Sequence, residues 1–310
     1  MDELDRKLLT KLEENPRTSS AKLAKELGSS KRTISKRLER LISSYGLVFT
    51  ALPDLNFFGY LKNVYILIHL ESQSSSDQIA KQICDFPQIR FVSACKGFAD
   101  ITCVGDFKSN EELVIFVTHD LGQIHGISQI ETMIELQSIK KMTFGRFAKM
   151  EQIESTKRNI TDISVDGDDY NLILELQKDS RASLKKLSTV INLSKPAIHR
   201  RIIKLINAGI IQLTAISDPS KIGYPTRSII LVSVVKSKMF SIAKIIAQYN
   251  RVTHVGIYSG PVKLFVGAYA SSPEDILQFA TKELSTIDGI LRTDLLIHTT
   301  LYKTKFAWIR

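Results

Sequence analysis

An internal repeat constrains the fold of this chain of 310 residues more than any other feature. Shifting the sequence by 164 positions, from Leu8 to Leu172, brings two long stretches into register without a gap. Apolar matches alone arise by coincidence between helical proteins, but polar and glycine residues also match. They are Arg17 with Arg181, Ser30-Lys31 with Ser194-Lys195, Gly59-Tyr60 with Gly223-Tyr224 and, after a slip of one residue, Gly97 with Gly260. The chain therefore contains two copies of one unit.

Each copy opens with a head that reads as three helices, expected in the first copy at 5–14, 19–27 and 30–43. Asn15-Pro16 ends the first helix, and Gly28 with Ser29 or Ser30 separates the other two. Ile34, Leu38 and Leu41 form one apolar stripe on the third helix, and basic side chains surround the rest of it. Two short helices joined by a tight turn, the second of them basic, are typical of a helix-turn-helix.

The remainder of each copy predicts a ferredoxin-like tail. A connecting strand at 47–51 and a turn at Pro53-Asp54 come first. The elements that follow have the order βαββαβ. They are expected at 64–70, 77–86, 89–94, 99–105, 110–121 and 130–142, and in the second copy at 228–235, 239–249, 252–269 for the hairpin, 273–284 and 292–303.

The predicted fold class is α+β, with two copies of a helix-turn-helix head followed by a ferredoxin-like βαββαβ domain. No helical or strand period survives between the copies, so this stretch is interpreted as a linker with mixed charge and no assigned function. The expected parts are a first head at 1–50, a first tail at 60–145, the linker at 146–167, a second head at 168–213 and a second tail at 224–310.

Composition and charge limit the kinds of partner and cofactor that the chain is expected to bind. The formal net charge of +10 favours an anionic partner such as nucleic acid. Apolar runs such as 229–235 are too short to span a bilayer, and the acidic N-terminus has no apolar signal core, so we expect no membrane partner and a cytoplasmic location. Cys84, Cys95 and Cys103 lack metal-site spacing and read as free, packed thiols, so we expect neither a metal nor a cofactor.

Several motifs together resemble the Lrp/AsnC family of transcription regulators. The motifs of the first copy are Leu4 to Leu9, Ser30 to Leu41, Gly59-Tyr60, Lys96 to Asp100 and His125 to Ile127; those of the second are Ser194 to Leu205, Ala208 to Ile211, Asp218-Pro219, Gly223-Tyr224 and Asp288 to Ile290. The resemblance implies tails of the RAM type that pack face to face, heads that bind double-stranded DNA at the nucleoid, and no enzyme activity. It also implies a homo-oligomer, a dimer of two-unit chains or larger, although two units in one chain depart from the usual single unit.

In a helix-turn-helix, the N-terminal part of the second helix meets base edges in the major groove. Arg40 lies further along its helix and is expected to contact phosphate, as are Lys22 and Arg17, and in the second head Arg201 and Lys204 extend the positive charge. Arg37 and Arg201 flank the apolar stripes, which leaves packing or an intramolecular ion pair as an alternative. The candidate DNA-binding residues are Ser30, Lys31, Arg32, Thr33, Ser35, Lys36 and Arg40 in the first head, and Ser194, Lys195, His199, Arg200 and Lys204 in the second.

The two reading faces are not equivalent. Arg32 corresponds to Pro196 and Ser35 to His199, and proline presents no polar side chain. If the two heads of one chain act as a pseudo-dimer, they should prefer an asymmetric DNA site with half-sites about one helical turn apart.

The resemblance also implies an amino-acid effector near a Gly-x-x-Asp hairpin in the tail. Gly97 and Asp100 match this motif, since a carboxylate pairs with an ammonium group and glycine lets backbone approach a small ligand. The second tail has Lys263 at the acidic position, which would repel an ammonium group. At most the first tail is therefore expected to hold such a ligand, and the alternative is that Asp100 is a turn-end carboxylate.

Two other functions compete with a regulator. Tetrapyrrole (sirohaem-type) decarboxylases resemble the same family and would need buried His, Arg or Tyr groups around a large cavity. The six histidines are scattered along the sequence, and each singly reads as structural. The other alternative is a sensing module that does not bind DNA.

Overall fold

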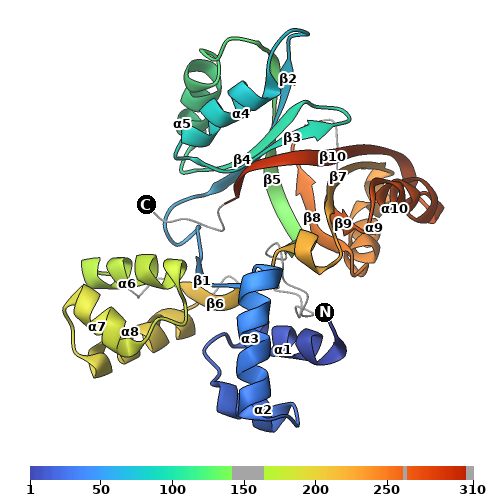
Figure 1. Cartoon of the computed structure of the whole chain (residues 1–310). Helices are drawn as coiled ribbons and strands as arrows, with labels where there is room; N and C mark the ends of the chain where they lie inside the picture. The colour runs from blue at the N-terminus through green and yellow to red at the C-terminus, as the bar shows by residue number, and fades with distance from the viewer. Residues whose placement is uncertain (142–163, 261–263, 305–310) are drawn as a thin grey trace. The chain divides into compact units, whose positions relative to one another are not determined.

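The structure is a computed structural model that describes residues 1–141, 164–260 and 264–304. The described parts of 1–58 and 164–222 form one compact unit, and those of 59–141 and 223–304 form another (Figure 1). The first unit contains both heads and the second contains both tails. Each compact unit therefore combines the corresponding parts of the two copies.

Each head is a bundle of three helices, as predicted. Ser30 and Ser194 cap the third helices by accepting hydrogen bonds from the amides of Thr33 and Ala197. The helices are α1 (Glu3–Glu14), α2 (Ser20–Glu26) and α3 (Lys31–Tyr45) in the first head, and α6 (Gly167–Lys178), α7 (Leu184–Ile191) and α8 (Lys195–Asn207) in the second. The predicted linker at 146–167 lies mostly outside the described residues.

One strand from each head joins the two bundles. β1 (Val48–Pro53) pairs antiparallel with β6 (Ile211–Ile216), and the strands lie side by side between the heads in Figure 1. Pro53 is the last residue of β1, whereas the sequence predicted a turn there. Ala51 of β1 packs in the core of the second head and Ala215 of β6 in that of the first. The predicted connecting strand is thus a shared structural element.

Polar contacts reinforce this junction reciprocally. The guanidinium of Arg17 donates to the carbonyl oxygens of Ser180 at 2.7 Å and Ala182 at 3.0 Å. Its counterpart Arg181 donates to the carbonyl oxygen of Thr18 at 3.4 Å. Both guanidiniums lose water on burial, which lowers their pKa. Two of the N–H donors of Arg17 are thus used within the head junction, and the phosphate contact expected of this residue stays a prediction.

The tails have the predicted βαββαβ order. In the first, the second helix continues beyond α5 as a π-helical turn, Phe116–Asp120, and in the second α10 does the same through Phe279–Glu283. The first tail has β2 (Lys62–Leu70), α4 (Ser76–Asp85), β3 (Ile89–Lys96), β4 (Ile101–Phe107), α5 (Asn110–Ile115) and β5 (Ile127–Lys141). The second has β7 (Thr226–Val234), α9 (Met239–Ala247), β8 (Val252–Tyr258), β9 (Leu264–Ala270), α10 (Pro273–Gln278) and β10 (Ile290–Thr304). The described residues of the second copy also form short 3₁₀ turns at Pro219–Ile222, Lys236–Lys238 and Leu284–Thr286.

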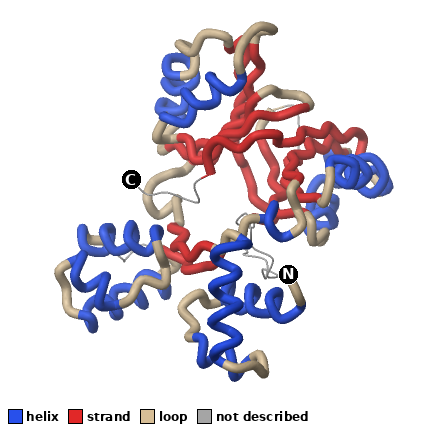
Figure 2. The backbone as a smooth tube through the Cα atoms, in the orientation of Figure 1, coloured by secondary structure: helices blue, strands red, loops and turns tan. Residues whose placement is uncertain are grey.

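The two sheets close into one barrel with the strand order β10-β3-β4-β2-β5-β8-β9-β7. Pairing of β5 with β8 and of β10 with β3 makes the two joins. Figure 2 shows the strands of both tails as one continuous sheet with helices on its outer surface. Among the described residues, each helix is too short or too polar to cross a membrane.

Aromatic rings fill much of the space inside the barrel. The ring of Tyr65 lies 4.1 Å from that of Phe265 and 5.7 Å from that of Tyr258, measured between centroids. Burial raises the pKa of the Tyr65 phenol to about 12, so the phenol stays neutral. Cys95 faces the same interior and Cys103 faces the helix side, and the three cysteines are free thiols as expected.

Candidate nucleic-acid interface

The recognition helix of the first head, α3, separates its apolar and basic sides. Ile34 and Leu41 are buried in the head, while Lys31, Arg32 and Lys36 are exposed. Within the described part of the chain, none of these three cations reaches a carboxylate at ion-pair distance. Arg32, Thr33, Lys36, Arg37 and Arg40 line an open hollow along this face. Among the described residues, the N-terminal part of this face therefore carries three cations without a carboxylate partner, whereas Arg37 and Arg40 further along it are paired.

The recognition helix of the second head, α8, has the same design with fewer charges. Ile198 and Leu205 are buried inward, while Lys195, His199 and Arg200 are exposed. Among the described residues, Lys195 and Arg200 likewise have no carboxylate partner. The structure therefore brings together the predicted DNA-binding residues at the N-terminal half of each recognition helix.

A carboxylate cluster at the start of α1 holds the middle of α3. Arg37 donates to Asp2 and to Asp5 at 2.8 Å, and Arg40 also donates to Asp5. The Asp5 side chain is fully buried, and Asp2 caps α1 in a capping box with Asp5. The hydrogen bond from Arg37 holds the pKa of Asp2 at about 2. We call these residues the acidic clamp of the first head.

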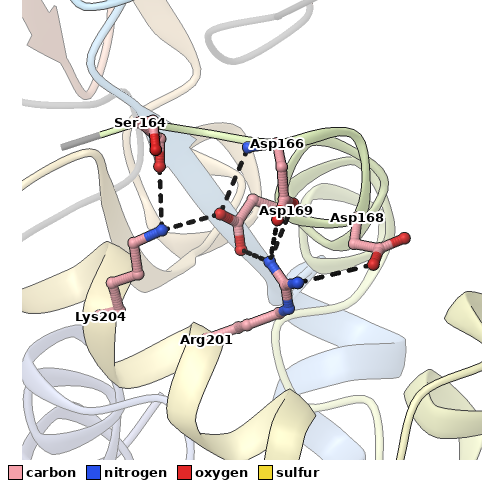
Figure 3. A network of polar contacts seen from close by, with 6 residues as sticks. All are labelled: Ser164, Asp166, Asp168, Asp169, Arg201 and Lys204. Carbon is pink, nitrogen blue, oxygen red and sulfur yellow. Dashed lines mark hydrogen bonds and ion pairs between the residues drawn. The ribbon is translucent and has the colours of Figure 1, made fainter.

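The second head repeats the acidic clamp (Figure 3). Arg201 donates to Asp166 at 2.8 Å and to the fully buried Asp169 at 2.7 Å, and its other terminal nitrogen lies 3.5 Å from Asp168. Lys204 donates to Asp169 at 3.0 Å and to the carbonyl oxygen of Ser164 at 2.9 Å. The hydrogen bonds that Arg201 donates to Asp169 and Asp166 raise the pKa of its guanidinium. Each clamp fixes a recognition helix to the first helix of its head.

The clamps change the interpretation of four basic residues. For Arg37 and Arg201, the alternative of an intramolecular ion pair is the arrangement in the structure. Arg40 and Lys204, predicted to contact DNA, also pair with the buried aspartates, although their side chains remain 47% and 42% exposed. A signal for the clamps is present in the sequence: Asp2 and Asp5 recur 164 positions later as Asp166 and Asp169.

The predicted effector residues lie at the hairpin between β3 and β4. Asp100 is exposed, and its carboxylate accepts a hydrogen bond from the amide of Leu70 at 2.9 Å. Gly97 has φ +136°, and a Cβ there would overlap the carbonyl oxygen of Leu295 in β10. The close approach that Gly97 permits in the structure is therefore to β10. The corresponding Lys263 lies outside the described residues.

The barrel interior contains a histidine cluster that sequence reasoning missed. The imidazole Nε2 of His254 forms a hydrogen bond of 3.0 Å with the Tyr258 hydroxyl and lies 3.7 Å from the Glu135 carboxylate. At the pseudo-equivalent place, His298 lies 3.6 Å from the thiol of Cys95, with burial lowering its pKa to about 3. Strand pairing between the two tails brings these residues together, and their sequence spacing carried no signal. Among the described residues, no group of three or more His, Cys, Asp or Glu is placed to hold a metal ion.

Comparison with family models matches three parts of the chain. An AsnC-type helix-turn-helix domain matches residues 1–42, an Lrp/AsnC ligand binding domain 63–143, and a winged helix-turn-helix DNA-binding domain 169–212. The HTH-type transcriptional regulator FL11 of Pyrococcus horikoshii is 31% identical over 136 residues, which are 44% of this chain and 89% of that protein. The chain belongs to the Lrp/AsnC family.

Two further comparisons cover one unit and the whole chain respectively. The uncharacterized HTH-type transcriptional regulator PF1231 of Pyrococcus furiosus is 28% identical over 140 residues, 45% of this chain and 95% of that protein. The crystal structure of the siroheme decarboxylase NirDL covers 98% of this chain and 94% of its own with a TM-score of 0.68. At 14% sequence identity, this likeness establishes the shared two-unit fold and no more.

Proposed function

We propose that this Lrp/AsnC protein is a sequence-specific transcription regulator whose two heads bind one duplex DNA site. The observation that carries the proposal is the position of the exposed cations. Lys31, Arg32 and Lys36 on α3, and Lys195 and Arg200 on α8, occupy the N-terminal halves of the recognition helices, where a helix-turn-helix meets base edges. A concentration of cations without internal partners suits a polyanion.

Each acidic clamp prepares a head for this role. The aspartates neutralise the cations in the middle of the recognition helix, such as Arg37 and Arg201, and leave those at its N-terminal end available. Because the Asp5 and Asp169 side chains are fully buried, each clamp also fixes the rotation of its helix about its axis. Lys31 and Arg32 are then suited to guanine edges, and Ser35 to a base or a phosphate.

The head junction makes the two recognition helices act together. The β1–β6 pair and the reciprocal contacts of Arg17 and Arg181 bury part of each head against the other. Two different reading faces held in one compact unit favour an asymmetric site over a palindrome. Assembly of the chain into a dimer or a larger homo-oligomer is a further proposal, which light scattering of the purified chain would test.

An amino-acid-type effector of the first tail is a separate proposal. The match of residues 63–143 to the Lrp/AsnC ligand binding domain and the exposed carboxylate of Asp100 support it. Calorimetry with a panel of amino acids, on the wild type and on Asp100→Ala, tests it. Binding by the wild type that Asp100→Ala weakens is the expected result, and no binding by the wild type would end the idea.

DNA binding is tested by fluorescence anisotropy with labelled duplexes across a range of salt concentrations. The affinity for duplex DNA is expected to fall steeply as the salt concentration rises. Removing one phosphate contact should reduce the slope of log affinity against log salt concentration by about one unit. The regulator proposal fails if the chain does not bind duplex DNA even at low salt. Binding of equal strength to all sequences would leave a DNA-binding protein without the proposed specificity.

A second candidate function is a tetrapyrrole decarboxylase, which would not bind DNA. The buried cluster of His254, Tyr258 and Glu135 favours it, since such an enzyme needs ionisable groups in an enclosed site. The rings of Tyr65, Tyr258 and Phe265 occupy the space around this cluster, which argues against a large planar ligand there. Absorbance spectroscopy after adding a tetrapyrrole discriminates: a bound spectrum without DNA binding would support the enzyme.

A further inference from the structure

The outward sides of the two recognition helices differ in chemistry as well as in charge. On α8, Ile198 and Ile202 turn inward, with 0% and 4% of their surfaces exposed. Pro196 and Ile203 are seven residues apart and therefore share the opposite side of the helix. Both are exposed, Ile203 by 43%. The reading side of the second head thus carries an apolar stripe.

The first head has charged residues at the equivalent positions. The offset of 164 relates Pro196 to Arg32 and Ile203 to Glu39, and both residues of the first head are exposed. The neighbouring position carries a cation in both heads, Lys36 and Arg200. Two charged residues of the first head are therefore replaced by two apolar residues on the outward side of the recognition helix, which would face DNA.

Base edges in the major groove distinguish these two chemistries. Arginine and lysine bind the acceptors of guanine, glutamate accepts from the amino group of cytosine, and an apolar side chain contacts the C5 methyl group of thymine. The ring of Pro196 and the branched side chain of Ile203 offer no hydrogen bond to a base. They are suited to methyl groups that would otherwise face water.

We infer that the second head selects thymine methyl groups through Pro196 and Ile203, whereas Arg32 and Glu39 select guanine and cytosine for the first head. This inference rests on the proposed function. The charges beside the apolar stripe favour DNA as its partner. The stripe lies between Lys195 and Arg200, cations that have no carboxylate partner among the described residues. A docking protein with an apolar surface would have to cover these cations as well, which DNA phosphates neutralise.

Replacing thymine by uracil removes the C5 methyl group and keeps every hydrogen-bonding group of the base. The wild-type chain first selects a site from random duplexes, and each half-site is then remade with uracil in place of its thymines. Affinity is expected to fall about fourfold for each bound methyl group removed from one half-site and to stay unchanged for the other. In Ile203→Ala, uracil in the sensitive half-site should cause a smaller loss.

Ile42→Ala is the matched control. Ile42 is an isoleucine on the recognition helix of the first head and is 46% exposed. It lies three residues beyond Glu39, the counterpart of Ile203, and is therefore further from the N-terminal end of its helix than Ile203 is. This variant should keep the full sensitivity to uracil. The inference is overturned if neither half-site responds to uracil, if the response is the same in Ile203→Ala as in the wild type, or if Ile42→Ala abolishes it.

The outcomes separate the inference from the proposed function. A chain that selects and binds a site but ignores the thymine methyl groups keeps its function as a regulator and loses this assignment. A chain that selects no sequence and binds no duplex overturns both together. A partner protein captured through Ile203, without any uracil effect, would also overturn the assignment.

Discussion

The two heads share their skeleton and differ on the surface that faces outward. Both begin with an aspartate capping box, both hold the recognition helix with an acidic clamp, and both lend a strand to the other head. On the reading side, however, Arg32 and Glu39 give way to Pro196 and Ile203. Interactions that fix the fold are retained in both copies, and divergence is found where a partner would be selected.

The tails show the same relation inside the barrel. Where the second tail has His254 and Tyr258, the first has Phe91 and Cys95, and the strands that pair with them carry Glu135 and His298. One of the two pseudo-symmetric places therefore holds a carboxylate, an imidazole and a phenol, from Glu135, His254 and Tyr258. The other holds an imidazole and a thiol, from His298 and Cys95. A covalent pair of units allows such asymmetry, which identical units in a homodimer exclude.

The largest expected effect tests whether the first head contributes more charge to binding than the second. The triple variant Lys31→Ala, Arg32→Ala and Lys36→Ala should weaken DNA affinity at least about 100-fold, since base-edge contacts contribute roughly 1–3 kcal/mol each and three of them total about 3 kcal/mol at the low end. The double variant Lys195→Ala and Arg200→Ala should lose less. Fluorescence anisotropy at several salt concentrations measures both, and equal losses would break the comparison.

The next effect compares the hairpins of the tails. Gly97→Ala forces a Cβ onto the backbone of β10 at φ +136°, whereas at Gly260, with φ +100°, an added Cβ meets no heavy atom of the described residues within 4 Å. A left-handed backbone costs a residue with a Cβ about 1–2 kcal/mol, and overlap adds about 1–3 kcal/mol. Urea denaturation should therefore show a free-energy loss about twice as large for Gly97→Ala as for Gly260→Ala. Similar losses would mean that β10 yields easily at Gly97.

The acidic clamps should behave alike in the two heads. Asp5→Asn and Asp169→Asn keep the side-chain volume and remove the charge that pairs with Arg37 and Arg201 respectively. Breaking a buried pair costs up to 3–5 kcal/mol, and about 2 kcal/mol is expected because the partners are partly exposed. Glu3→Gln, in an exposed pair with Lys7, serves as control and should change stability by less than about 1 kcal/mol. A large loss in one head alone would contradict their equivalence.

The smallest effect, taken over one unit of pH, is the acid response of the barrel. Burial lowers the pKa of His298 to about 3, below the value of about 6.5 for a free imidazole. The folded state then binds fewer protons than the unfolded state between these pH values, so stability decreases as pH falls from about 6.5 toward 3. The contribution is at most about 1.4 kcal/mol per pH unit. Denaturation of His298→Gln should show a flatter pH dependence, and an unchanged one would refute this role.

Much of the fold followed from local sequence patterns and the repeat. The apolar stripes, the Ser30 and Ser194 caps and the βαββαβ order predicted nearly every helix and strand, because these depend on neighbours within a few residues. The pairing of β1 with β6 and the closure of the barrel depend on contacts between copies, which no periodicity records. The junction role of Arg17 was missed for the same reason.

In the candidate site, too, local features could be predicted from the sequence and long-range contacts could not. The exposed residues at the N-terminal ends of α3 and α8 could be predicted from helical spacing, because solvent exposure follows from the opposite apolar stripe. The partners of Arg40 and Lys204 could not, since Asp5 and Asp169 lie 35 residues away in sequence and reach them only in the folded head.

The central claim is that two unlike heads of one chain read one duplex site. Selection of binding sites from random duplex DNA by the purified full-length chain, followed by sequencing, tests it most directly. The expected result is an enriched site without two-fold symmetry, with half-sites centred about 10 base pairs apart, one rich in guanine and cytosine and the other containing thymine. Enrichment of perfect palindromes, or of no sequence at all, would contradict it.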